Sequence, residues 1–404
     1  MKKKAKLPGK TISLFAPWPF FAADEIAAAQ SVLKSGKVNY WTGEEGRFFE
    51  KEFSTFIGTR YAVALANGTV ALELALYALG IGPGDEVIVA SRTFIASASC
   101  IVMRGATPVM ADVDLASQNI SAETIKPLIT QRTKAIIAVH LAGWPCDMDP
   151  IMELAQKYNL KVIEDCAQAH GATYRGKPVG SLGHVAAFSF CQDKIITTGG
   201  EGGMLTTDDQ AVWEKAWSYK DHGKNYDAVY GPQVGNGFRW LHDSFGTNWR
   251  LTELQAAIGR IQLRKLPSWL KKRRAHASLL TKEFMHIPAL RVTVPSPEIE
   301  HAYYKYYVFI RPELLKHEWT RDRIQAEINA AGVPCYNGSC SEIYLEKAFP
   351  EHLRPSRRLQ VAKELGETSL MFLVHPTLTT ADIKRTCTVV KKVLQEATRQ
   401  VDVT

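Results

Sequence analysis

Short apolar runs alternate with helix-like stretches from residue 61 onward. The runs rich in Val, Ile and Ala predict strands at 61–66, 86–90, 108–113, 135–140 and 161–164. The stretches between them predict helices at 69–79, 93–104 and 149–158. Continuous apolar strands separated by helices are typical of a parallel sheet that is buried on both faces. We therefore expect an α/β fold with a mostly parallel central sheet flanked by helices.

The pattern changes after residue 165. Short strands expected at 186–190 and 203–206 flank a glycine-rich loop, and a long helical stretch follows at 251–284. Farther along, the sequence predicts a strand at 304–310 and helices at 320–331 and 381–398. This indicates two domains. We expect an N-terminal arm of about forty residues and a large domain in 1–262, then an interdomain helix and a smaller α+β domain in 263–404.

The composition permits a large core. The chain has 404 residues, of which 46% are hydrophobic and 22% are charged, so neither disorder nor a fibre is indicated. No apolar run reaches the roughly 18 residues of a membrane span. The basic start, MKKKAKLPGK, is not followed by the apolar core of a signal peptide. We expect a cytoplasmic protein without a membrane segment.

The charge distribution and the cysteine spacing argue against a nucleic-acid-binding protein, a disulfide-rich protein and a metal-binding protein. The net charge is +8, and the basic residues are spread out or gathered at 265–274, where they predict a solvated helix face. No nucleic-acid-binding motif accompanies them, although a positive field would suit a small polyanion such as a nucleotide diphosphate. The seven cysteines form no C-x-x-C pair, so we expect reduced thiols, with neither a disulfide framework nor a metal site.

Two candidate site motifs lie where expected strands end. Asn67-Gly68-Thr69 joins a strand to a helix, and backbone N–H groups beside a glycine at a helix N-terminus can hold a phosphate. Such junctions also carry Gly and Thr for turn and capping reasons. Asp165 ends an apolar strand at the sheet edge where ligands of open α/β sheets bind, and it could pair with a protonated ring nitrogen. A helix N-cap is the alternative for Asp165.

The third motif surrounds a lysine. Lys194 lies in a near-apolar loop rich in hydroxyl groups and glycines, between Phe188 and Gly203. Most lysines are solvated surface charges, whereas a nucleophilic lysine needs a fixed position. The loop does not fit G-x-x-x-x-G-K-[ST], because its lysine precedes the glycines, and this disfavours a nucleotide-triphosphate loop.

The fourth motif precedes the long helix. Asn248 and Arg250 lie within Thr247-Asn248-Trp249-Arg250. Both are good anion-binding residues, and both could equally belong to an ordinary helix start.

In order, spacing and residue identity, these motifs resemble the DegT/DnrJ/EryC1/StrS sugar aminotransferases. This family belongs to the fold-type-I, aspartate-aminotransferase-like enzymes that use pyridoxal 5'-phosphate (PLP). The resemblance extends from about residue 20 to about residue 393. It rests on the N-G-T-x-A-L-x-L, E-D-x-A-Q-A-H-G and S-F-x-x-x-K stretches and on N-x-R before the helix. Together they are highly specific, although each alone is not.

The resemblance implies a role for each matching residue. Lys194 would hold PLP as a Schiff base and then shuttle protons, and Asp165 would keep the pyridine nitrogen protonated. Lysine rather than histidine at position 194 favours amino transfer over dehydration. The other cofactor contacts implied are Gln168 to the phenolic oxygen and Gly68, Thr69 and Ser189 to the phosphate. Phe94 is the candidate for stacking on the ring, and a core aromatic is the alternative reading of this residue.

The resemblance also implies partners. Asn248 would reach the phosphate of a neighbouring subunit, which predicts a homodimer with shared active sites. An amino acid, expected to be glutamate, would donate the amino group to a nucleotide-linked keto-deoxy sugar for surface polysaccharide or antibiotic biosynthesis. Arg250 and Tyr336 are the candidate substrate-binding residues.

The chain departs from common family patterns at two places. Gln192-Asp193-Lys194 replaces the usual Thr-Lys context, and the segment 332–342 lacks the His-Tyr often found near the sugar. The exact acceptor therefore stays open, and a keto-cyclitol is an alternative. A regulatory or binding protein without turnover is an alternative from another class, against which the presence of Lys194, Asp165 and Gln168 argues.

Overall fold

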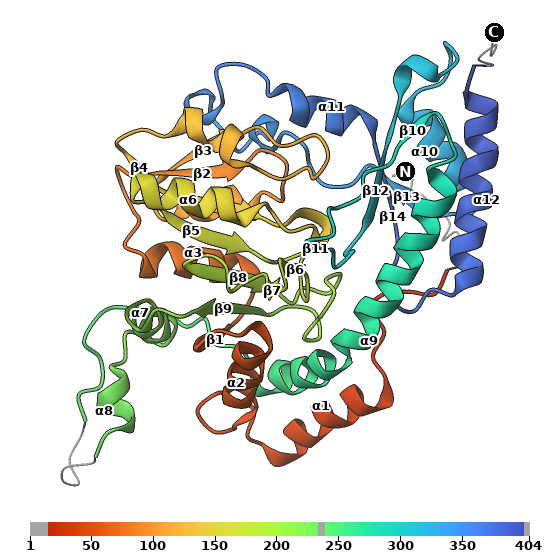
Figure 1. Cartoon of the computed structure of the whole chain (residues 1–404). Coiled ribbons are helices and arrows are strands. Elements are labelled where there is room, and N and C mark those ends of the chain that lie inside the picture. The colour runs from red at the N-terminus through yellow and green to blue at the C-terminus, as the bar shows by residue number, and fades with distance from the viewer. Residues whose placement is uncertain (1–14, 233–238, 400–404) are drawn as a thin grey trace, which may run out of the picture.

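The computed structural model describes residues 15–232 and 239–399. The part of the expected N-terminal arm before residue 15 lies outside the described residues. In the first two-thirds of the chain, a seven-stranded sheet has the order β1-β9-β8-β5-β4-β2-β3 (Figure 1). Its strands are β1 (Tyr61–Leu65), β2 (Glu86–Ala90), β3 (Thr107–Ala111), β4 (Thr133–Val139), β5 (Lys161–Asp165), β8 (Val185–Ser189) and β9 (Gly203–Thr207).

The sheet is mostly parallel, as the sequence predicts. From β3 through β2, β4 and β5 to β8 every neighbouring pair is parallel, and β9 runs antiparallel to β8 and β1. Every residue of β2, β8 and β9 is buried, because helices cover both faces and leave no solvated side.

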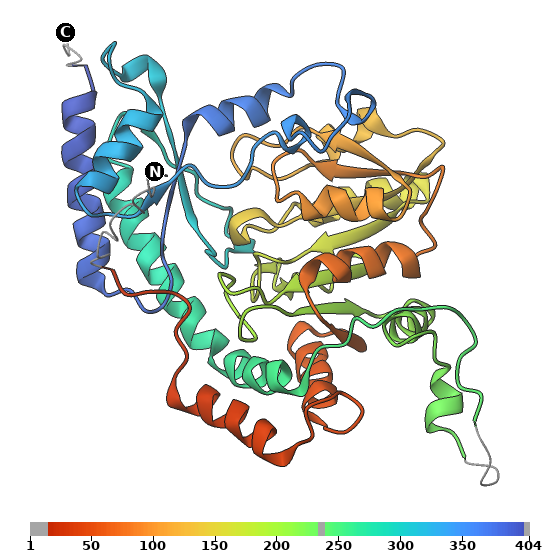
Figure 2. The ribbon, with the colours of Figure 1, turned by 180° about the vertical axis from the view of Figure 1, so that it is seen from behind.

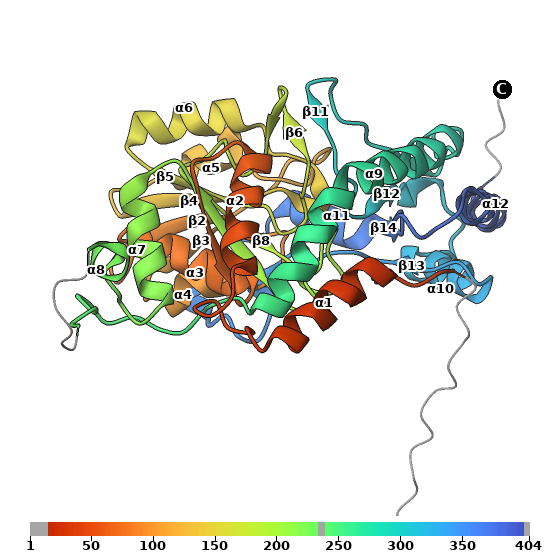
Figure 3. The same ribbon diagram turned by 90° about the horizontal axis from the view of Figure 1, so that it is seen from below.

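The covering helices lie on two sides of the sheet, as the view from below shows (Figure 3). One side carries α5 (Ala122–Ile125) and α6 (Met148–Tyr158), and the other carries α3 (Gly68–Ala78) and α4 (Ala96–Met103). The outer elements on the β1 side are α2 (Glu45–Ile57), α7 (Gln210–Lys220) and α8 (Tyr226–Tyr230). Because strands β2 to β5 are joined through helices, their carboxyl ends meet at one edge of the sheet.

A single long helix connects the two parts of the chain. Helix α9 (Glu253–Phe284) begins at a capping box in which the Thr252 side chain accepts from the backbone of Gln255, and it runs without interruption past residue 262. Helix α1 (Ala23–Ser35) packs along α9, and Lys265 on α9 pairs with Asp24 at 2.7 Å. The described part of the arm therefore lies against the interdomain helix.

The basic run on α9 is solvent-accessible at most positions, as its sequence predicts, but not at Arg273. Lys271 and Lys272 are exposed, but Arg273 is 1% exposed, and its guanidinium donates to the backbone oxygens of Tyr303 and Tyr304. The prediction was wrong for Arg273 because a run of charges does not show which residue of a helix turn faces a neighbouring domain.

The smaller domain is built on a four-stranded antiparallel sheet seen beside α9 in the reverse view (Figure 2). Its strands are, in order, β10 (Leu290–Arg291), β12 (Tyr306–Ile310), β14 (Ser369–Phe372) and β13 (Cys335–Tyr336). Its helices are α10 (Arg321–Ala330), α11 (Gln360–Thr368) and α12 (Thr380–Ala397).

Short elements complete the chain. A three-stranded sheet joins the two parts through β11 (Ile299–Glu300), β6 (Thr173–Tyr174) and β7 (Lys177–Pro178). The 3₁₀ turns are η1 (Lys126–Leu128), η2 (Leu141–Gly143), η3 (Pro312–Leu314), η4 (Ile343–Leu345) and η5 (Glu351–Leu353). Within the described ranges, no helix is both long enough and apolar enough to cross a membrane.

Candidate active site

Asp165 occupies the carboxyl end of β5, at the edge where the parallel strands end. The side chain is buried, and its carboxylate accepts from Ser97 Oγ at 2.7 Å and from the backbone N–H of Ala167 at 3.1 Å. Burial raises the pKa of Asp165, although these two hydrogen bonds oppose the shift. A carboxylate that has lost its water and has few donors favours a cationic partner at this edge.

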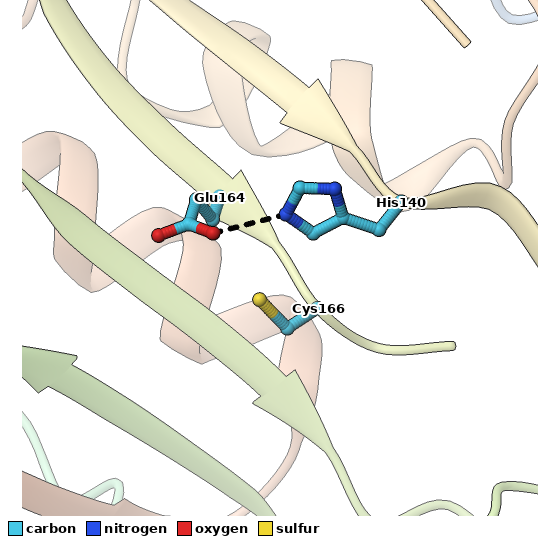
Figure 4. Close-up of side chains that lie close together, drawn as sticks. All are labelled: His140, Glu164 and Cys166. Atoms are coloured by element: carbon cyan, nitrogen blue, oxygen red, sulfur yellow. Dashed lines mark hydrogen bonds and ion pairs between the residues drawn. The ribbon is translucent and has the colours of Figure 1, made fainter. Parts of the chain in front are cut away.

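Next to Asp165 lies a buried cluster of His140, Glu164 and Cys166 (Figure 4). The Nε2 of His140 lies 3.0 Å from Oε2 of Glu164, and Nδ1 accepts from the backbone N–H of Cys146, so Nε2 carries the hydrogen. Glu164 also accepts from three backbone N–H groups within residues 180–183, at 2.7–2.8 Å. These contacts occupy the His140 nitrogens and both Glu164 oxygens, and they hold the 180–183 turn against β5.

Lys194 lies in the loop between β8 and β9. Its side chain is 18% exposed, and its Nζ lies 3.3 Å from Oδ1 of Asp193 and 5.1 Å from the centre of the Tyr304 ring. Its backbone oxygen accepts from the indole of Trp18 at 2.8 Å. The Lys194 charge is one of the influences that oppose the burial-driven rise in the pKa of Asp165. Strand β8, which leads into the Lys194 loop, pairs in parallel with β5, which ends at Asp165. The sequence motifs at 165 and 194 are thus brought together.

The N-terminus of α3 and the end of β8 form a tight cradle. Asn67 caps the helix, and Thr69 in its first turn is exposed. A Cβ atom at Gly68 would lie 2.6 Å from Cβ of Ser189, so only glycine permits this approach. The N–H groups of a first helical turn have no partner within the helix and are suited to an anion.

Gln168 follows Asp165 by three positions, and Phe94 lies in the segment that contains Ser97, whose hydroxyl donates to Asp165. The Oε1 of Gln168 accepts from the backbone N–H of Ala142 at 2.7 Å, which leaves its NH₂ group to donate to a ligand oxygen. Phe94 belongs to the segment whose Thr93 and Ser97 hydroxyls lie 2.9 Å apart. Phe94 is 65% exposed, which excludes the alternative that it is a core aromatic. Its role in ring stacking stays a prediction.

The other candidate residues lie farther along the chain. Arg250 pairs with the buried Asp221 at 2.7 Å, and its backbone bridges to Leu65 at the end of β1. Asn248 is exposed, and Tyr336 on β13 is 44% exposed. Within the described part of the chain, no hydrogen bond joins Asn248, Arg250 or Tyr336 to Lys194 or Asp165, so their roles stay predictions.

The arrangement fits PLP. A lysine amine, a buried acid for a protonated ring nitrogen, an amide donor for a phenolic oxygen and a helix N-terminus for a phosphate lie around one sheet edge. Gly68 lets the start of α3 lie directly against Ser189, at the helix end whose free N–H groups suit a phosphate. Fold and site together define a fold-type-I PLP-dependent transferase.

Comparison with known proteins gives the family. Residues 20–391 match the DegT/DnrJ/EryC1/StrS aminotransferase family, and the chain belongs to it. It is 40% identical to GDP-perosamine synthase of Caulobacter vibrioides, over 88% of this chain and 92% of the relative. It is 34% identical to dTDP-3-amino-3,4,6-trideoxy-alpha-D-glucose transaminase of Streptomyces venezuelae, over 94% of both.

A solved aminotransferase from Psychrobacter cryohalolentis has the same fold. Its TM-score is 0.93 at 57% sequence identity, over 95% of this chain and 99% of that one. The fold, the PLP cofactor and the aminotransferase activity expected from the sequence are therefore confirmed. His140 and Glu164 were missed by sequence reasoning; the E-D pair at the strand end was a signal for Glu164, and nothing marked His140.

Proposed function

We propose that this chain transfers an amino group from an amino acid, glutamate being the expected donor, to a nucleotide-linked keto-deoxy sugar. The product is an amino sugar for surface polysaccharide or antibiotic biosynthesis. The observation that supports the proposal is the buried Asp165 at the end of β5, beside strand β8, which leads into the Lys194 loop. Relatives named for GDP-linked and dTDP-linked amino sugars, at 40% and 34% identity, support a nucleotide-sugar acceptor.

Each site residue has one task. Asp165 stabilises a proton on the ring nitrogen, Gln168 donates to the phenolic oxygen, and Gly68, Thr69 and Ser189 hold the phosphate. When bound, PLP supplies an aldehyde that carries the amino group between substrates and a ring that accepts electrons.

Lys194 acts at two stages. Its amine anchors the cofactor between turnovers. Once released, Nζ takes the proton from the α-carbon of the donor and returns a proton within the same site. The acceptor half of the reaction uses the same steps in reverse, so one amine serves both substrates.

The proposed assembly is a homodimer in which Asn248 completes the phosphate site of the partner. The exposed position of Asn248 supports this, as does the 99% exposed Phe245 beside it. Phe94 at 65% exposure would be covered by the cofactor or by the second subunit. Arg250 and Tyr336 are proposed to contact the substrates.

The proposal includes a division of the chain into 1–262 and 263–404 and a cytoplasmic location. All seven cysteines are free, five of them buried, which is typical of a reducing compartment.

The first test is an absorbance spectrum of the purified chain with PLP, before and after borohydride. A visible band that borohydride removes, with the label mapped to Lys194, supports the proposal, whereas no band and no label contradict it. A keto-cyclitol acceptor is separated from a nucleotide-linked keto sugar by offering each in turn and measuring amination. Binding of both without turnover would favour the regulatory alternative.

A further inference from the structure

An acid directly precedes the reactive lysine, and this departs from the Thr-Lys context common in the family. Oδ1 of Asp193 lies 3.3 Å from Nζ of Lys194, and the hydroxyl of Tyr304 donates to Oδ2 of the same carboxylate. The two oxygens of Asp193 thus have different partners. One faces the amine, and the other is held by a residue 111 positions away in the chain.

Tyr304 fixes the geometry of this pair from the smaller-domain side of the site. Its side chain is 8% exposed. Burial and the Asp193 charge raise the pKa of Tyr304 well above its usual range, so the hydroxyl keeps its proton and remains a donor. The Nζ of Lys305 lies 4.8 Å from the centre of the same ring, and burial lowers the pKa of Lys305 to about 8.

Asp193 remains ionised in these surroundings. Its partial burial favours the neutral acid, but the Lys194 charge and the Tyr304 hydrogen bond outweigh this, so the pKa of Asp193 lies below its usual value. The titratable groups that act on Asp193 or Lys194 here are Asp165, His170, Cys191, Tyr304 and Lys305. The buried Arg273 adds a further positive charge to Tyr304 and Lys305.

We propose that Asp193, held by Tyr304, is the counter-ion of Lys194 whenever its amine is free of the cofactor. Asp193 stabilises the ammonium form that Lys194 adopts between taking up one proton and returning another. Asp193 itself neither gains nor loses a proton, so Lys194 remains the only group that carries the transferred proton. The inference rests on the proposed function, in which Lys194 leaves the cofactor during each half-reaction.

The exposure of Asp193 sets how strongly its charge stabilises the Lys194 ammonium. The Asp193 side chain is 49% exposed, so water screens the pair, and such pairs contribute at most about 1 kcal/mol. Asp193→Asn, which removes this charge, should make the amine of Lys194 about fivefold more reactive toward an acylating reagent at neutral pH, the equivalent of about 1 kcal/mol. Asparagine keeps the size of the side chain and an oxygen for Tyr304.

The experiment measures the reactivity of Lys194 rather than turnover. The full chain is loaded with pyridoxamine phosphate, which leaves the amine of Lys194 free, and is labelled briefly with acetic anhydride at pH 7. Mass spectrometry compares labelling of Lys194 with that of the exposed Lys215 on α7 in the same sample. Asp193→Asn should label about fivefold faster at Lys194 relative to Lys215, and Asp193→Glu should restore the wild-type rate to within about twofold.

Two further variants separate charge from shape. Tyr304→Phe keeps the ring but removes the donor that orients Asp193, so labelling should rise by a smaller factor, about twofold. The matched control is Asp149→Asn. This variant removes another half-exposed acid, the ion-pair partner of Arg175, and should leave the labelling rate of Lys194 unchanged.

The outcomes are distinct. Equal labelling of Lys194 in wild type and Asp193→Asn overturns the counter-ion role while the proposed function stands. A rise in Asp193→Asn that Asp193→Glu does not reverse means that the loop shape, and not the charge, protects the lysine, and this also overturns it. If pyridoxamine phosphate does not co-elute with the wild-type chain, the proposed function fails and the counter-ion role with it.

Discussion

Replacing Gly68 at the start of α3 by alanine should destabilise the fold and weaken PLP binding, and the structure gives the size of both effects. In Gly68→Ala the new Cβ would lie 2.6 Å from Cβ, 3.0 Å from Cα and 3.1 Å from Oγ of Ser189. Because Cα of Ser189 belongs to the fully buried strand β8, it cannot move aside as a flexible side chain would. The helix N-terminus must move instead, and overpacking of this kind costs about 1–3 kcal/mol.

Part of that cost is offset. Alanine is favoured over glycine in a helix by about 0.5–1 kcal/mol, so the net destabilisation of Gly68→Ala should be about 0.5–2 kcal/mol. The displaced N–H groups should also bind the phosphate less well. We expect PLP to bind at least about tenfold more weakly, which corresponds to about 1.4 kcal/mol.

The assay is a titration of each variant with PLP followed by absorbance, together with a thermal unfolding curve. Gly82→Ala is the matched control, because its Cβ would meet nothing closer than the oxygen of Arg104 at 3.7 Å. It should bind PLP like the wild type. If Gly68→Ala binds PLP as tightly as Gly82→Ala, the close approach to Ser189 does not shape the phosphate site, and the reasoning is refuted.

Four other predictions concern the remaining site residues. Lys194→Ala should abolish turnover and the Schiff base that borohydride fixes to the chain, while leaving the unfolding temperature near that of the wild type; retained multiple turnover would contradict the assignment. Asp165→Asn should slow turnover about a hundredfold or more, roughly 2.7 kcal/mol, measured as kcat with saturating substrates. Because burial raises the pKa of Asp165 in the cofactor-free chain, PLP affinity should weaken in the wild type as the pH falls toward that raised pKa and Asp165 loses its charge, and it should change less in Asp165→Asn. Mixing inactive Lys194→Ala and Asn248→Ala subunits should restore activity, since each mixed dimer has one undamaged site; no recovery after verified exchange would place Asn248 in its own subunit's site.

Sequence patterns predicted the elements that periodicity defines. The continuous apolar runs gave β2 at its observed bounds, and the long helix expected at 251–284 is observed at 253–284. The helix expected at 93–104 is observed at 96–103; Thr93 lies before it, with its hydroxyl 2.9 Å from that of Ser97, and Ser97 donates to Asp165. Strand β14 was not anticipated; it has four residues, too few for a period to be read.

Contacts between residues far apart in the chain could not be predicted from sequence patterns. Motif matches placed Lys194 and Asp165 in one site, because both lie in stretches with a recognisable order. The hydrogen bond from Tyr304 to Asp193 joins residues 111 positions apart; Asp193 fills a variable position of the lysine motif, and Tyr304 belongs to no motif. The buried state of Arg273 likewise depends on backbone oxygens contributed by another element. Such contacts follow from tertiary packing, which local sequence patterns do not reveal.

The adjacent acids on β5 show what distinguishes a functional carboxylate from a structural one. Glu164 and Asp165 are both buried, and as neighbours on a strand they face opposite sides of the sheet. Glu164 is saturated by His140 and by three backbone N–H groups of residues 180–183. Asp165 has only the Ser97 hydroxyl and one backbone N–H, and burial raises its pKa. A buried carboxylate with few hydrogen-bond donors gains most from a cationic ligand. Asp165, which has fewer donors than Glu164, is therefore the carboxylate suited to bind the protonated ring nitrogen of the cofactor.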